Sequence, residues 1–128
     1  MTKILPLLED PSLLVRLKAV PAIEQLKPVG FQEALAKAVS DTRNFRGGKA
    51  QWVPYRALTA LENTSAPKSV LPLMAPALSQ NSDLKFQTQL IQTLEKLSGS
   101  SLKAGQPLAE KVTAWKDYFK NTKPNRSS

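Results

Sequence analysis

Residues 5–26 read LPLLEDPSLLVRLKAVPAIEQL. A leucine-rich segment comes first, and Asp10 and Pro11 form a predicted turn after it. The apolar residues that follow are four, four and three positions apart: Val15, Ala19, Ile23 and Leu26. This spacing puts them on one face of an α-helix, so the stretch predicts two helices joined by a tight turn.

Pro21 lies inside the second of these helices. Proline has no backbone N–H, and its ring crowds the carbonyl of Leu17 one turn earlier. Two interpretations stay open: the helix is kinked at Pro21, or it ends near Val20 and Pro21 begins another turn. Pro72 and Pro76 pose the same problem in residues 67–78, where we expect a curved helix.

Helical spacing continues through the rest of the chain, and no segment has the alternating pattern of a strand. The further apolar faces are Phe31, Leu35 and Val39, then Val53, Ala57 and Leu61, then Leu90, Leu94 and Leu97, and finally Leu108, Val112, Trp115 and Phe119. Asn81, Ser82 and Asp83 are candidate caps before the third of these faces, and Gly99 is a candidate left-handed cap after it. We therefore expect five to seven helices.

Two internal similarities indicate a repeat. ILPLL at residues 4–8 recurs as VLPLM at residues 70–74. The helix that carries Val15 matches the one that carries Val53, 38 residues later, and that one matches the helix of Phe86, 33 residues further on. Such periods are typical of arrays of helix pairs, in which each pair buries its apolar face against its neighbours.

The first unit resembles a HEAT-type repeat. Members of that family have a leucine-rich first helix, an Asp-Pro turn, and a second helix that opens with Val-Arg and has an alanine one turn later; Asp10, Pro11, Val15, Arg16 and Ala19 match this pattern. The resemblance implies that Asp10 and Arg16 order the turn and stack along the array. The second unit keeps Asp41, Val53 and Ala57, but Pro54 replaces the arginine.

These observations predict an all-α domain: a short right-handed α-α superhelix, HEAT-like, of about three antiparallel helix pairs. We expect residues 1–121 to form this single domain and residues 122–128 to form a polar, disordered tail. No apolar run is long enough to cross a bilayer, and the first residues do not resemble a signal peptide.

The composition limits the chemistry. The chain has no Cys and no His, which excludes a Ser-His-Asp or Cys-His triad and the usual zinc ligands. The carboxylates show no paired-acid or calcium-loop spacing. We therefore expect no enzyme activity, no cofactor, no metal and no small-molecule substrate. The compartment cannot be read from a chain without cysteine.

Residues 41–56, DTRNFRGGKAQWVPYR, form the candidate site. In the repeat register they contain an insertion, and insertions in such arrays often supply a contact surface. The candidate partner-binding residues are Arg43, Phe45, Arg46, Lys49, Trp52, Tyr55 and Arg56. For Trp52 and Tyr55 we favour packing into the core, because large aromatic side chains usually serve burial first. For Arg43, Arg46 and Lys49 a partner and plain solvation remain equally open.

The net charge of +8 favours an acidic partner. Because the basic residues are spread along the chain, we expect a non-catalytic protein-interaction module that binds a protein or peptide. The alternative is a nucleic-acid binder that contacts phosphates through Arg43, Arg46, Lys49 and Arg56. A weaker third possibility is an accessory domain of an enzyme.

Overall fold

The computed structural model describes residues 4–79, 83–102 and 105–121. Its six α-helices are α1 (Leu13–Leu26), α2 (Phe31–Ser40), α3 (Trp52–Asn63), α4 (Leu71–Met74), α5 (Leu84–Ser98) and α6 (Leu108–Asn121). The 3₁₀ segments are η1 (Leu5–Glu9), η2 (Thr42–Asn44), η3 (Lys68–Val70) and η4 (Ala75–Leu78). The all-α prediction is confirmed. The expected tail at 122–128 and the candidate caps Asn81 and Ser82 lie outside the described residues.

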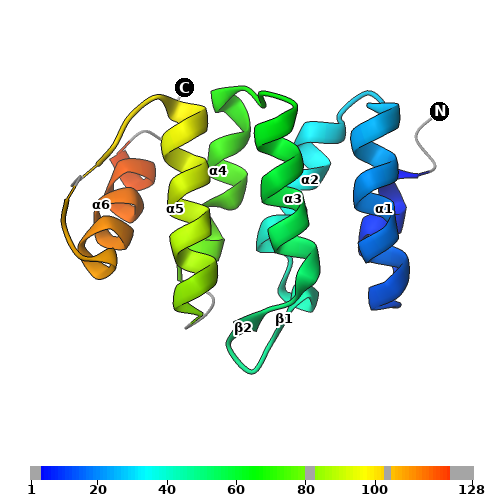
Figure 1. Cartoon of the computed structure of the whole chain (residues 1–128), viewed down its shortest axis with the longest axis horizontal. Coiled ribbons are helices and arrows are strands. Elements are labelled where there is room, and N and C mark those ends of the chain that lie inside the picture. The colour runs from blue at the N-terminus through cyan, green and yellow to red at the C-terminus, as the bar shows by residue number, and fades with distance from the viewer. Residues whose placement is uncertain (1–3, 80–82, 103–104, 122–128) are drawn as a thin grey trace.

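The helices form two rows (Figure 1). Helices α1, α3 and α5 lie side by side in one row, where α3 contacts both neighbours. Segment η1, helix α2 and the α4–η4 segment lie behind them, and α2 contacts both α3 and α4. The N-terminal ends of α1, α3 and α5 all lie at the same end of the row, the lower end in Figure 1.

Local caps explain where several helices begin and end. The Ser12 hydroxyl accepts the Val15 N–H at the start of α1, and the Asp83 carboxylate accepts the Phe86 N–H at the start of α5. Gly99 ends α5 with φ 76°, the left-handed conformation expected for it. Helix α1 continues through Pro21 to Leu26, so it does not end at Val20.

Two helix predictions are wrong in detail. Leu26 is 67% exposed and Val15 only half-buried, whereas α1 buries Arg16, Ala19, Val20 and Ile23. The buried face is turned toward Arg16 and Val20 because α1 packs against both α3 and η1. Residues 68–78 are not one regular helix but three consecutive short helical segments, η3, α4 and η4, since Pro72 and Pro76 interrupt the backbone hydrogen bonding.

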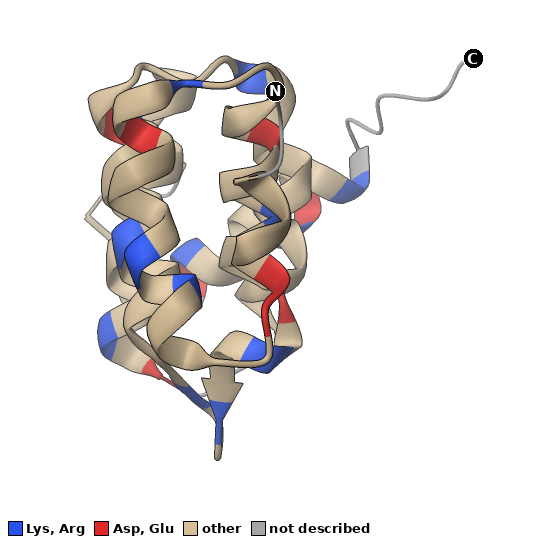
Figure 2. Ribbon diagram, turned by 90° about the vertical axis from the view of Figure 1, so that its right-hand side faces the viewer, with Lys and Arg blue, Asp and Glu red and all other residues tan. Residues whose placement is uncertain are grey.

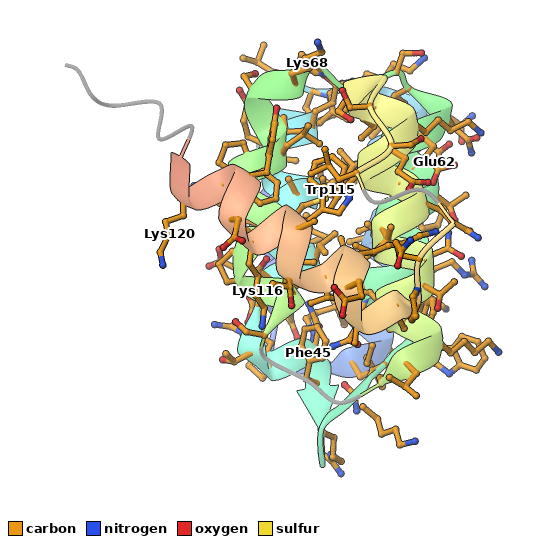
Figure 3. All side chains as sticks on the ribbon, turned by 90° about the vertical axis from the view of Figure 1, so that its left-hand side faces the viewer. Phe45, Glu62, Lys68, Trp115, Lys116 and Lys120 are labelled. Atoms are coloured by element: carbon orange, nitrogen blue, oxygen red, sulfur yellow. The ribbon has the colours of Figure 1, made fainter. Side chains whose placement is uncertain are left out.

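One hydrophobic cluster extends through the two rows, from Leu8 to Trp115. Helix α6 crosses the end of the rows and contacts α5 and η4. Trp115 points from α6 toward the interior (Figure 3) and is 0% exposed. The apolar stripe expected at Val112 and Trp115 is therefore buried, and α6 closes the end of the core. Among the described residues, no helix is long and apolar enough to span a membrane.

The expectation that the chain has no strand is wrong. Strands β1 (Phe45–Arg46) and β2 (Lys49–Ala50) pair antiparallel, with Phe45 opposite Ala50 and Arg46 opposite Lys49. Gly47 and Gly48 both have positive φ, 60° and 81°, which a two-residue hairpin turn of this type requires. The hairpin projects beyond the helix ends (Figures 1 and 2).

Candidate binding surface at the hairpin

The buried Arg16 joins the first turn of the chain to the segment before the hairpin. Its side chain donates from Nε to the Asn44 Oδ1 (2.8 Å) and from one terminal nitrogen to the Asp10 and Pro11 carbonyls (2.7 and 3.2 Å). The other terminal nitrogen donates to the Arg43 carbonyl at 3.3 Å. Asn44, also buried, donates to the Ala38 carbonyl. These bonds fix η2 against the N-terminal end of α1.

Arg43 is less available to a partner than its residue type suggests. Its Nε forms an ion pair with the Asp41 Oδ1 at 3.0 Å, and a terminal nitrogen donates to the Glu9 carbonyl. The side chain remains 45% exposed. Arg43 therefore belongs partly to the scaffold, although one side of it still faces solvent.

Asp83 holds the hairpin against α5. Its Oδ2 accepts the Ala50 N–H (3.0 Å) and the Tyr55 hydroxyl (3.4 Å), while its Oδ1 caps α5. Burial opposes the charged form, but the Phe86 and Ala50 N–H groups, the charge of Lys49 and the Tyr55 hydroxyl outweigh it. The pKa of Asp83 is therefore lowered. Burial and the Asp83 charge raise the pKa of Tyr55.

Phe86 of α5 packs against aromatic side chains of the hairpin and of α3. It is fully buried, and both Phe45 and Tyr55 contact its ring edge-to-face, with centroid distances of 5.5 and 5.4 Å. Phe45 and Tyr55 are half-buried in this contact. Tyr55 thus packs against the core, as favoured, and so does Phe45.

Trp52 contradicts the favoured prediction. It is 64% exposed at the first position of α3 and does not pack into the core. The reason is helical geometry, because Val53 and Ala57 take the buried face of α3 and turn Trp52 outward.

We define the hairpin surface as the exposed residues Arg46, Lys49, Trp52, Arg56 and Lys85. They come from β1, β2 and the N-terminal ends of α3 and α5. Lys85 was not among the candidate residues, because nothing in its local spacing connects it with the loop 30 residues earlier. Helix dipoles add to the positive charge here, since three helix N-termini meet at this end of the row.

Two open hollows flank the hairpin and share Gln51. The arginine hollow, of about 600 Å³, is lined by Pro11, Leu13, Arg16, Arg43, Arg46 and Gln51. The tryptophan hollow, of about 510 Å³, has Gln51, Trp52, Tyr55, Arg56, Thr59 and Lys85 among its lining residues. The structure thus brings Arg46 to one hollow and Arg56 to the other, and no acidic side chain lines either of them among the described residues.

The opposite end of the same row carries acidic residues. Glu24, Glu62 and Glu95 lie near the C-terminal ends of α1, α3 and α5. Glu24 accepts a hydrogen bond from Asn63, and Glu62 binds Thr93 and Lys96, so two of these acids bridge neighbouring helices. Among the described residues, the hairpin end of the row therefore carries unpaired basic residues, whereas the other end carries both signs of charge, since Lys27 follows α1 and Lys96 pairs with Glu62.

Scans against protein-family models, curated proteins and solved structures find no match to this chain. The function must therefore be inferred from the geometry of the chain itself.

Because the pKa of Asp83 is lowered, its ionised form stabilises the folded chain. This contribution is fully present above the unfolded-state pKa, about 4, and is lost as the pH falls through the lower folded-state pKa. We expect Asp83→Asn to lower the free energy of unfolding by about 1 kcal/mol at pH 7, and by less at acidic pH. Urea denaturation of the wild-type chain and of Asp83→Asn, at pH 7 and at an acidic pH, measures this difference in the free energy of unfolding. An equal difference at both values would contradict the role of the Asp83 charge.

Proposed function

We propose that this chain is a non-catalytic interaction module that binds an acidic segment of a protein partner at the hairpin surface. In this proposal the two rows are a short right-handed HEAT-like superhelix of about three helix pairs. The second helix of each pair, α1, α3 and α5, forms the binding row.

The contacts of Arg16 support the repeat interpretation. The resemblance implies that this arginine orders its own turn and stacks along the array. Arg16 donates both to the Asp10 and Pro11 carbonyls of its own turn and to Asn44 of the next unit. Contacts between neighbouring helices of the row, α1 with α3 and α3 with α5, are also those of a stacked array.

The observation that carries the binding proposal is the exposed Trp52, which lines one hollow together with the basic residues Arg56 and Lys85. Tryptophan and arginine are the residues most enriched at energetic centres of protein interfaces. Here they line the tryptophan hollow together, with Tyr55 held in place by Asp83. An acidic segment with an apolar side chain would pair with the charges of Arg56 and Lys85 and pack against the indole ring of Trp52.

The charge distribution along the row favours a protein segment over a nucleic-acid duplex. A duplex lying along α1, α3 and α5 would meet the carboxylates of Glu24, Glu62 and Glu95. A short acidic segment can occupy the basic end alone. Like charges that face each other across an interface oppose binding, so these carboxylates, of which Glu62 is paired with Lys96, disfavour an extended polyanion along the row.

The test is the binding of a fluorescent glutamate-rich peptide at low salt. We expect the triple variant Lys49→Ala, Arg56→Ala and Lys85→Ala to weaken binding about ten-fold, since three exposed charge pairs are each worth about 0.5 kcal/mol. The matched control removes three exposed lysines that line neither hollow: Lys37→Ala, Lys68→Ala and Lys116→Ala. The net charge is then the same in both variants.

Equal weakening by the two triple variants would overturn the proposed surface. A random DNA duplex is the second probe, because nucleic-acid binding through Arg43, Arg46, Lys49 and Arg56 was the alternative expectation. If the duplex binds more tightly than the peptide, with a steep loss of affinity as salt rises, the partner is a nucleic acid and the protein-partner proposal fails.

A further inference from the structure

The arginine hollow combines a buried cation with two more arginines. Arg16 is only 4% exposed and makes no ion pair with a described carboxylate, since its acceptors are the Asn44 amide oxygen and backbone carbonyls. Burying a charge without a counter-ion is costly, and such charges are normally paired. An anion bound in the hollow would therefore lower the free-energy cost of burying the Arg16 charge.

The hydrogen-bond count of Arg16 supports the same conclusion. A guanidinium has five N–H donors, and four hydrogen bonds are assigned to Arg16. One N–H on the nitrogen that binds the Arg43 carbonyl has no assigned acceptor. Arg16 is among the residues that line the hollow, so a ligand that reaches this N–H could accept the hydrogen bond.

The charge of the hollow matches a dianion. Arg16, Arg43 and Arg46 bring three positive charges, and Asp41, which is paired with Arg43, offsets one of them. About two positive charges remain. A phosphate monoester carries about −1.5 to −2 at pH 7, whereas a carboxylate or a phosphodiester carries only −1. A guanidinium also donates two parallel hydrogen bonds to two oxygens of a phosphate. A single carboxylate has too few oxygens to bind three arginines in this way.

We propose that the arginine hollow binds the phosphate group of a phosphorylated serine or threonine in the partner segment. This inference rests on the proposed function, and it assigns Arg46 a role separate from that of Arg56. The two hollows share Gln51, so one extended segment can place a phosphate beside Arg46 and an apolar side chain beside Trp52.

The experiment compares two acidic peptides that differ at one position, phosphoserine in one and glutamate in the other. The wild-type chain should bind the phosphoserine peptide about ten-fold more tightly. Arg46→Ala should reduce this preference to about two-fold or less. Arg56→Ala, at the other hollow, should weaken both peptides but keep the preference. Arg16 is left unchanged because its replacement threatens the fold.

Inorganic phosphate provides a readout without a peptide. Phosphate also raises the melting temperature of any folded chain by exclusion from its surface, so the readout is the difference between variants. At matched ionic strength, replacing sodium chloride by sodium phosphate should raise the melting temperature of the wild-type chain and of Arg56→Ala more than that of Arg46→Ala. An equal increase in all three proteins would overturn the proposal.

The outcomes separate this inference from the proposed function. If both peptides bind equally well, the phosphate site is wrong and the acidic-segment surface stands. If neither peptide binds, the proposed function fails as well. If a single-stranded oligonucleotide displaces the phosphoserine peptide at the same salt concentration, the phosphate belongs to a nucleic acid and the inference is overturned.

Discussion

Replacing Arg16 by methionine should lower the free energy of unfolding by about 3 kcal/mol. Methionine fills much of the same volume but cannot donate, so it leaves the Asn44 Oδ1 and the carbonyls of Asp10, Pro11 and Arg43 without their donor. An unsatisfied buried polar group costs about 1 to 3 kcal/mol, and partial relaxation of the turn keeps the sum well below four such penalties. Urea denaturation at neutral pH measures the loss.

Two further variants test the cause of that loss. Arg16→Lys keeps the charge but not the planar fork of donors, so an intermediate loss is expected. A double-mutant cycle with Asn44→Ala should give a coupling of about 1 kcal/mol or more, because the two side chains contact each other directly. Additive losses, or a methionine variant as stable as wild type, would show that Arg16 does not join α1 to η2.

Replacing Trp115 by alanine should cost about 4 kcal/mol, the largest loss expected for this chain. Trp115 is fully buried, and its ring lies 5.1 Å from that of Tyr118 and 5.9 Å from that of Phe119. Removing a buried aromatic side chain costs about 3 to 5 kcal/mol through lost burial and the cavity left behind. Because α6 contacts α5 and η4, the loss would expose the end of both rows.

Trp115→Phe is the informative control. The indole Nε1 of Trp115 is buried and has no hydrogen-bond partner among the described residues. Removing this N–H should therefore carry no penalty, and phenylalanine should lose only the difference in buried area, about 1 kcal/mol. A loss as large as that of Trp115→Ala would show that the N–H does have a partner. Denaturation followed by far-UV circular dichroism avoids the altered fluorescence of these variants.

The candidate site was only partly predictable from the sequence. Residue types and spacing identified the loop and four of the five residues of the hairpin surface, namely Arg46, Lys49, Trp52 and Arg56. They did not identify Lys85, nor that Asp83 anchors the loop through the Ala50 N–H, 33 residues earlier. Asp83 was predicted only as a helix cap, because a cap has a local signature and a long-range acceptor has none.

Helix boundaries, caps and apolar stripes depend on residues only a few positions apart, so the all-α class, the Gly99 terminus and the apolar stripe that carries Trp115 followed from the sequence alone. Which side of a helix is buried depends on the elements that meet it. For that reason the tertiary structure alone decided that Arg16 is buried and Leu26 exposed, that Trp52 points to solvent, and that the N-termini of α1, α3 and α5 lie at the same end of the row as the hairpin.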